Sequence, residues 1–245
     1  GQARLDPEDA QTLSFTVDVP QARLWSPTDP QLYHVRLAFA GDELIERTGF
    51  RELRVAGRQV LLNGQPLRLQ GVNRHEDHPD WGSALPVHLI LRDLVLLQDV
   101  GGNALRGAHY PNDQLLLDLC DERGIMVWQD GAFACALYPD TDPHFMALVR
   151  DELTYNIKRL RNHPSLVIWC GENENHWGYD DWWSGDRHFS HFYGSQIYDQ
   201  LFPALVRELD PDRFYWNGSP YSEEPGVRAN DELRGDTHFW DLHSN

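Results

Sequence analysis

The sequence has 245 residues, with 21 Lys and Arg against 38 Asp and Glu, which gives a formal net charge of −17. This acidity excludes a basic surface for nucleic-acid phosphates or anionic membranes. The composition, 41% hydrophobic and 11% aromatic residues, is that of a globular protein. No apolar run approaches the ~20 residues that cross a bilayer. The three cysteines (Cys120, Cys135 and Cys170) are too few for a disulfide framework, and we expect all three to be buried thiols.

The first part of the chain is expected to form antiparallel strands. Residues 13–19, 32–39 and, more weakly, 48–55 alternate apolar and polar side chains, and prolines separate these segments. A complete β-sandwich needs ~7 strands, and the segment offers fewer. We therefore interpret residues 1–57 as the C-terminal part of a sandwich domain.

Strands alternate with helices from about residue 58 onward. The turn residues Asn63 and Gly64 lie between two short apolar runs and predict a hairpin. Further strands are predicted over residues 67–73, 103–106, 125–128, 165–170, 213–217 and 237–240, and helices over residues 88–100, 112–123, 141–161 and 191–209. This order predicts an α/β fold with a parallel sheet, either doubly wound or closed as a barrel.

Polar and aromatic side chains follow five of the predicted strands. In parallel α/β folds the carboxyl ends of the strands carry the functional site. The segments concerned are residues 71–76, 106–111, 128–130, 169–177 and 236–240. Repeated Trp, His, Asn and Arg suit a sugar, because indole rings stack on pyranose faces and polar groups bond hydroxyls. Trp128 and His238 are therefore candidate substrate contacts, although each taken singly is equally compatible with a packing role.

Glu174 is the candidate general acid. It follows a strongly apolar strand and precedes a group of aromatic residues: Trp177, Tyr179, Trp182 and Trp183. Such a setting is expected to raise the pKa of a carboxyl group, as a general acid at neutral pH requires. The alternative is that Glu172 and Glu174 form an exposed acidic loop, and Glu172 is also the rival candidate for the acid.

Other chemistries receive weaker support. His75, Glu76 and His78 resemble a metal-binding cluster, but their spacing lacks the helical geometry of H-E-x-x-H. No G-x-S-x-G motif supports a serine hydrolase, and no glycine-rich phosphate loop supports a nucleotide. We therefore predict no cofactor.

The strand-end motifs resemble those of glycoside hydrolase family 2, which contains β-galactosidases, β-glucuronidases and β-mannosidases. The resemblance covers nearly the whole chain, and the order of the motifs makes it specific. They are residues 48–51 (TGFR), 62–66 (LNGQP), 71–76 (GVNRHE), 103–106 (NALR), 109–111 (HYP), 120–124 (CDERG) and 161–169 (RNHPSLVIW). The resemblance implies an immunoglobulin-like β-sandwich ending within residues 1–57, followed over residues 58–245 by an incomplete (β/α)8 TIM barrel of about six strands.

The resemblance also implies roles for individual residues. The family's acid/base is the Glu of an Asn-Glu pair, which corresponds to Asn173 and Glu174. Glu174 would protonate the leaving oxygen and then activate water, while Asn173 would bond the sugar 2-hydroxyl. His75 and His109 resemble sugar-contacting histidines, and Arg106 would help to hold the carboxylate pair.

Subfamily signals conflict. Residues 127–139 and 171–175 resemble β-mannosidases, although Glu172 stands where those enzymes have Asn and lacks a preceding Asn of its own. The motif at residues 109–111 is instead that of the galactosidase and glucuronidase branches. Magnesium ligands of the galactosidase type fall on Ala134 and Ala136, so no such metal is expected. β-Mannosidase is favoured.

A retaining mechanism needs a second carboxylate ~5 Å from the acid. In the family it lies in a Ser-Glu-(Tyr/Phe)-Gly-like motif after the seventh barrel strand, and this chain contains no such motif. We therefore expect the isolated chain to be inactive. The hypotheses are a piece of a retaining exo-β-glycosidase, a non-catalytic carbohydrate-binding relative, or a metal-dependent hydrolase.

The expected partner is a carbohydrate, with neither nucleic acid nor membrane. An incomplete barrel leaves unpaired strand edges, so self-association through the open edge is expected as well. The compartment is undetermined, with the cytoplasm favoured.

Overall fold

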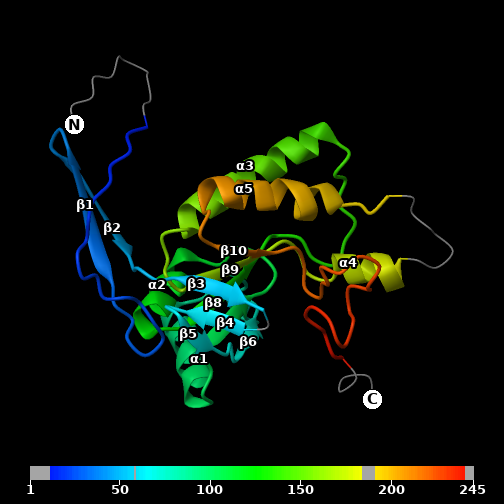
Figure 1. The fold of residues 1–245 in the computed structure, drawn as a ribbon, viewed down its shortest axis with the longest axis horizontal. Helices are drawn as coiled ribbons and strands as arrows, with labels where there is room; N and C mark the ends of the chain where they lie inside the picture. The colour runs from blue at the N-terminus through cyan, green and yellow to red at the C-terminus, as the bar shows by residue number, and fades with distance from the viewer. Residues whose placement is uncertain (1–11, 58, 184–190, 241–245) are drawn as a thin grey trace.

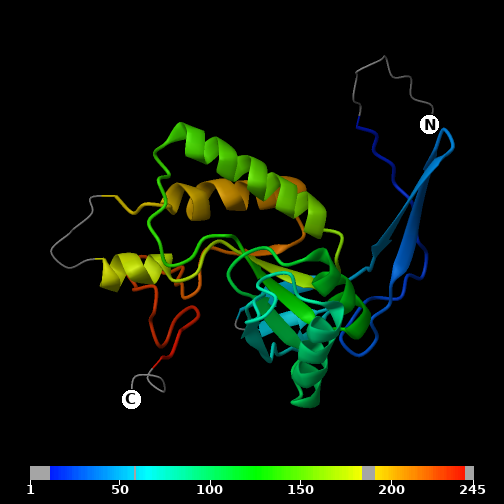
Figure 2. The same ribbon diagram turned by 180° about the vertical axis from the view of Figure 1, so that it is seen from behind.

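The computed structural model describes residues 12–57, 59–183 and 191–240, and its first regular element is an antiparallel hairpin (Figure 1). Strands β1 (Tyr33–Phe39) and β2 (Asp42–Thr48) pair along their full length. The turn between them places Ala40 and Gly41 at φ angles of +50° and +91°, and such positive angles are typical of two-residue hairpin turns. The hairpin lies to one side of the remaining elements in both views (Figures 1 and 2).

A small antiparallel sheet follows, made of β3 (Leu53–Ala56), β4 (Gln59–Leu62) and β5 (Gln65–Leu67). The predicted Asn63-Gly64 turn joins β4 to β5, which confirms the hairpin expected there. Leu53 and Leu67 of this sheet pack against a buried cluster that includes the fully buried Trp25. β3 and β4 pair across residues 57 and 58, where the sequence predicts a domain boundary, and that boundary stays a prediction.

The main sheet is parallel and five-stranded. Its strands are β6 (Gly71–Arg74), β7 (Ala104–Gly107), β8 (Met126–Asp130), β9 (Leu166–Cys170) and β10 (Phe214–Trp216). They lie side by side in chain order, with at least one helical segment between every two consecutive strands. A doubly wound sheet reverses its strand order at a switch point, and this sheet does not. The order is therefore that of part of a (β/α)8 barrel.

Helices cover the outside of the sheet. They are α1 (Val87–Asp99), α2 (Gln114–Arg123), α3 (Pro143–Leu160) and α5 (Phe202–Leu209), the last continuing the π-helical turn η2 (Gln196–Leu201). Asp113 begins α2 by accepting a hydrogen bond from a backbone N–H of the first turn, and Gly124 ends it at a φ of +70°. Asp142 caps α3, and Pro143 occupies its first turn. α3 and α5 pack side by side (Figures 1 and 2).

Two buried clusters hold these layers together. The larger one fills the space between the sheet and the helices, and includes Leu94 of α1, Leu117 of α2, Val127 of β8 and Ile157 of α3. The smaller one combines Trp25 with residues at the starts of the parallel strands: Ala104, Met126, Val167 and Ile168. The apolar residues that recur along the helices and strands thus form the core. The polar residues lie outside it, at the carboxyl ends of the strands.

Several predicted elements differ from the structure. Residues 13–19 form no strand, and residues 42–47, for which no strand was predicted, form most of β2. Of the segment predicted more weakly over residues 48–55, Thr48 ends β2 and a new strand begins only at Leu53. Residues 237–240 form no strand either, so the described residues contain five barrel strands rather than about six. The helix predicted over residues 191–209 is helical from Gln196, and its first part is a π-turn, because Pro203 lacks a backbone N–H for the regular ladder. No helix among the described residues is long and apolar enough to span a membrane.

Candidate functional site

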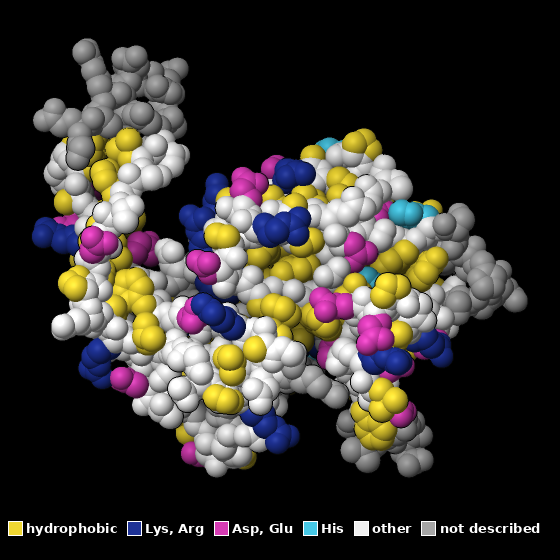
Figure 3. Space-filling view, viewed as in Figure 1, with side chains coloured by type: hydrophobic (Ala, Val, Ile, Leu, Met, Phe, Trp, Pro, Cys, Tyr) yellow, Lys and Arg dark blue, Asp and Glu magenta, His cyan; other side chains and the backbone are white. Residues whose placement is uncertain are grey.

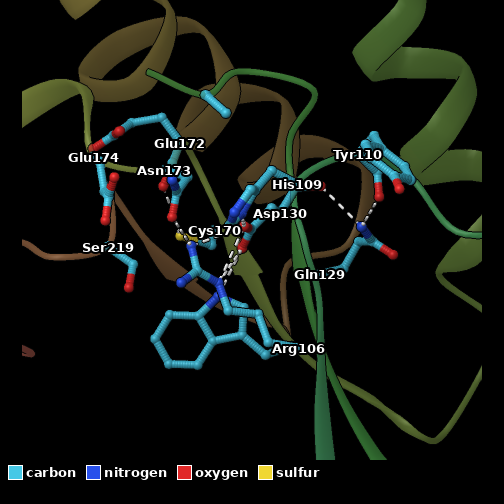
Figure 4. Close-up of polar contacts among 12 residues, drawn as sticks. Arg106, His109, Tyr110, Gln129, Asp130, Cys170, Glu172, Asn173, Glu174 and Ser219 are labelled. Carbon is cyan, nitrogen blue, oxygen red and sulfur yellow. Dashed lines mark hydrogen bonds and ion pairs between the residues drawn. The ribbon is translucent and has the colours of Figure 1, made fainter. Parts of the chain in front are cut away.

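The carboxyl ends of the parallel strands bring the predicted residues together. Arg106 comes from β7, Asp130 ends β8, and Asn173 and Glu174 follow β9 (Figure 4). Isolated bridges link Asn173 to Ala134 on one side and to Ser219 on the other, so the loops after β8, β9 and β10 run on beside one another. The short helix α4 (Asn175–Trp177) and the π-turn η1 (Gly178–Trp182) start directly behind Glu174.

Asp130 organises one half of the site. Its side chain is fully buried and accepts hydrogen bonds from Arg106 Nε at 2.9 Å, His109 Nδ1 at 2.8 Å and Trp128 Nε1 at 3.1 Å. Because a carboxylate accepts, His109 carries its proton on Nδ1. Arg106 Nη2 also donates to Asn173 Oδ1 at 3.0 Å, so one guanidinium ties β7 to the ends of β8 and β9.

Glu174 is held in an unusual backbone conformation. Its φ is +62°, in the left-handed region that residues with a Cβ rarely adopt, and its backbone N–H donates to Ser219 O at 2.9 Å. One carboxylate oxygen, Oε1, accepts from His238 Nδ1 at 2.7 Å and from Trp240 Nε1 at 3.1 Å. The other, Oε2, lies 3.4 Å from Cys135 Sγ.

These donors determine the protonation of the carboxyl group. Burial alone would raise the pKa of Glu174, but the hydrogen bonds to its two oxygens and the charge of His238 together outweigh burial and lower the pKa below its usual value. The expectation of a raised pKa is therefore wrong for this chain, because polar donors and not only aromatic faces surround the carboxyl group. Trp177, one of the aromatic residues expected behind Glu174, lies with its ring centroid 6.4 Å from that of His238.

Glu172, the rival candidate for the acid, lies elsewhere. Its side chain is fully buried, and Oε1 is 2.7 Å from His176 Nδ1 while Oε2 accepts from the backbone N–H of Asn175. Although burial lowers the pKa of His176, hydrogen bonds to Asp199 and Glu172 raise it to about 9. A Cβ at Gly218 would lie 1.8 Å from Glu172 Oε1, so the backbone of the loop after β10 packs directly against this carboxylate. Glu172 therefore supports the loop and has no open face.

The remaining predicted residues lie around the same opening. The exposed ring of His75 packs edge-on against His109 with centroids 5.1 Å apart, and the guanidinium of Arg106 lies 5.7 Å from the ring centroid of Trp128. Arg106, Trp128 and His238 line a cavity of about 360 Å³ together with Asn73, Ser219 and Asp236. The structure thus brings all the predicted contact residues to one end of the sheet.

The metal hypothesis finds no support in the geometry. Glu76 Oε2 accepts from the backbone N–H of Asp113 at 3.1 Å, and His78 Nδ1 accepts from the backbone N–H of Asp80 at 3.1 Å. Within the described ranges, donor atoms that could share an ion converge at Asp118, Asp121 and His163, remote from the cluster proposed from sequence. Asp121 there already accepts from His163 Nδ1 and the backbone N–H of Ser165.

Sequence reasoning missed Ser219 and Cys135, and it gave Asp130 and Trp240, which lie in the predicted strand-end segments, no role of their own. Asp130 had a usable signal, because it is an ionisable residue at the end of an apolar strand. Ser219 and Trp240 join the site through loops whose course periodicity does not predict. Cys135 was expected to be buried like Cys120 and Cys170, which are buried; instead it is exposed, at a φ of +47°.

Comparison with known families identifies the family of this chain. A family model described as the TIM barrel domain of glycosyl hydrolases family 2 matches residues 53–216, and a second model of glycosyl hydrolases family 2 matches residues 2–51. The chain belongs to glycosyl hydrolase family 2. It is therefore part of a family of glycosidases, as the sequence motifs indicated.

Solved structures of family members resemble this chain closely. A β-D-mannosidase from Dictyoglomus thermophilum is 36% identical over 90% of the chain, with a TM-score of 0.80. A family 2 β-galacturonidase from Eisenbergiella tayi is 38% identical over 82% of the chain, with a TM-score of 0.67. β-Glucuronidase 3 from Bacteroides uniformis is 30% identical over 84%, with a TM-score of 0.69. The family 2 chain spans 29%, 34% and 26% of the lengths of these three proteins.

Proposed function

We propose that this chain is the acid/base half of a retaining exo-β-glycosidase that removes terminal β-linked sugars, with β-mannosides as the favoured substrates. The observation that carries the proposal is the position of Glu174 at the mouth of the strands, beside Asn173 and next to a cavity lined by Trp128 and Arg106. Glu174 would protonate the glycosidic oxygen in the complete enzyme, where the nearby nucleophilic carboxylate would raise its pKa, and would then activate water. The nucleophilic carboxylate would come from a part of the whole enzyme that lies outside this chain.

A neutral sugar fits the charges of the site better than a uronic acid. Arg106 is the cation that lines the cavity, and its charge is already paired with Asp130, with Nη2 and Oδ2 at 2.8 Å. Asp236 adds a negative charge to the same lining. Among the described residues of this lining, a sugar carboxylate would find no cation that is not already paired, which favours β-mannosidase over β-glucuronidase, while β-galactosidase remains the neutral alternative. The Dictyoglomus β-D-mannosidase, with a TM-score of 0.80 against 0.67 for the β-galacturonidase, supports the same choice by structure, although the galacturonidase is 38% identical and the mannosidase 36%.

The decisive experiment compares two conservative variants of the full-length enzyme. Glu174→Gln is expected to lower kcat for nitrophenyl β-mannoside at least about 100-fold, because the general acid and base is lost. Glu172→Gln keeps a similar side chain at a buried position and is the matched control, expected to lose stability more than turnover per folded molecule. Full activity of Glu174→Gln with inactive Glu172→Gln would assign the acid to Glu172.

The same preparations separate the remaining alternatives. Parallel assays with nitrophenyl β-galactoside and β-glucuronide identify the sugar, and proton NMR of the first product shows whether the anomeric configuration is retained. The isolated chain is expected to turn over none of these substrates. Sugar binding without turnover by the full-length protein would instead support the non-catalytic carbohydrate-binding relative.

A further inference from the structure

The two oxygens of the Glu174 carboxylate have unequal surroundings. Oε1 accepts from His238 Nδ1 at 2.7 Å and from Trp240 Nε1 at 3.1 Å, and an indole N–H can only donate. Two hydrogen bonds thus engage this oxygen, as many as its two lone pairs accept. Oε2 faces Cys135 Sγ at 3.4 Å, which is a weak donor. Oε2 is therefore the oxygen that can exchange a proton with a substrate.

The imidazole of His238 is fixed from its other side. Ser219 Oγ lies 3.0 Å from Nε2 and donates its hydrogen to Asp236 Oδ2 at 2.5 Å. Asp236 Oδ1 in turn accepts from Trp216 Nε1 at 2.8 Å, at the end of β10. The ring is thus tied to the rigid sheet, and its Nδ1 points at Oε1.

The backbone of His238 is tied down as well. Its N–H donates to Asn230 Oδ1 at 2.9 Å, and its carbonyl accepts from Asn230 Nδ2 at 3.1 Å. The side chain is 14% exposed, so little of it remains for a substrate. His238 therefore holds the Glu174 carboxylate through Oε1 before any substrate binds.

We propose, on the basis of the proposed glycosidase function, that His238 is a positioning residue, not a sugar contact, and that it holds Oε1 so that Oε2 is the reactive oxygen of Glu174. Its Nδ1–H stabilises the carboxylate form, which the enzyme needs when Glu174 acts as base. Ser219 and Asp236 keep the ring in place. The side chain of His238 therefore serves the acid/base residue and not the specificity for a sugar.

The pH profile of kcat/KM of the full-length enzyme tests this role. A hydrogen bond to the ionised form lowers a carboxyl pKa, so its loss raises the pKa. Because glycosylation requires protonated Glu174, the alkaline limb of the profile for His238→Leu is expected to move up by about one pH unit, while kcat falls. Ser219→Ala is expected to shift the limb in the same direction by less. The other ionisable groups around the carboxylate are present in both enzymes: Cys135, Glu172, Arg106, Asp130 and Asp236. Of these, Arg106 loses a neighbour in His238→Leu, because its Nη1 lies 3.3 Å from His238 Nε2.

A conservative variant separates positioning from a merely structural role. His238→Asn places an amide N–H near the position of Nδ1 and is expected to return the alkaline limb close to that of the unmodified enzyme. His75→Leu removes a histidine at the same end of the sheet that does not contact Glu174, and it is expected to leave the alkaline limb in place even if KM changes. A His238→Leu enzyme with raised KM but an unmoved limb would overturn the proposal in favour of a sugar contact. If Glu174→Gln is fully active, the proposed function fails instead, whatever the His238 variants show.

Discussion

Strained residues gather at the point where acid/base chemistry is proposed. Glu174 and Cys135 both have positive φ angles, +62° and +47°, and each costs roughly 1–3 kcal/mol in a residue with a Cβ. The cost is offset by contacts that the conformation makes possible, since Asn173 O accepts from the backbone N–H of Cys135 at 2.9 Å. The two loops thus hold the thiol and the carboxylate against each other.

Cys135 offers a chemical probe of this contact. Although the residue as a whole is exposed, its thiol is partly buried against Glu174. This partial burial, followed by the hydrogen bond to Glu174, raises the pKa of the thiol to about 11, so at pH 7 it is expected to react with iodoacetamide roughly 100-fold more slowly than an ordinary cysteine. Glu174→Gln removes the adjacent charge and is expected to speed the reaction. Peptide mass spectrometry of the full-length enzyme measures the labelling of each thiol.

The other two cysteines of the chain provide the internal control. Cys120 and Cys170 are fully buried and are expected to stay unlabelled under native conditions. An adduct on Cys135 lies against Oε2 and is expected to abolish turnover, while Cys135→Ala is expected to be resistant to the reagent. Labelled enzyme that retains full activity would contradict the placement of Cys135 beside the reacting oxygen.

At the scale of elements, the sequence predicted what depends on local chemistry. Caps such as Asp142 and Gly124 mark helix ends because they satisfy backbone groups within a few residues. Hydrogen bonds from side chains elsewhere in the chain, which compete with strand pairing, were not predictable. Residues 237–240 alternate like a strand, but the Asn230 side chain bonds both the N–H and the C=O of His238, so no ladder forms.

The same contrast holds within the site. The strand ends and the Asn173-Glu174 pair were readable from pattern and motif, whereas the charge state of Glu174 was not. It depends on His238 and Trp240, 64 and 66 residues farther along the chain. Alternation at residues 13–19 likewise predicted a strand, although a strand also needs a partner, and the described residues supply none there.

Trp25 connects the first part of the chain to the barrel. It is fully buried, its Nε1 donates to Asp121 O at 2.8 Å, and its backbone N–H donates to Phe50 O at 2.7 Å. Trp25→Ala is expected to lower the free energy of unfolding by about 3–5 kcal/mol, measured by urea titration. Trp81, which is 54% exposed, is the matched control. Trp81→Ala is expected to change the free energy of unfolding by less than about 0.5 kcal/mol. Equal effects of the two changes would contradict this role.

At the scale of the whole molecule, the sheet is open at both edges. Among the described residues no strand pairs with the outer edge of β6 or of β10. Val72 on β6 is 52% exposed, and both Nη atoms of the neighbouring buried Arg74 have no hydrogen-bond partner. Hydrophobic side chains also gather on the β1–β2 hairpin (Figure 3), where Phe39 is 65% exposed.

Unpaired edges bind other edges, so the isolated 245-residue chain is expected to self-associate. Light scattering after size-exclusion chromatography is expected to show a mass that rises with concentration. Val72→Lys places a charge on the β6 edge and is expected to reduce the association strongly, whereas Phe39→Lys tests the hairpin surface instead. A monomer at every concentration would refute the expectation. If Phe39→Lys abolishes association and Val72→Lys leaves it unchanged, association proceeds through the hairpin and not through the open edge of the barrel.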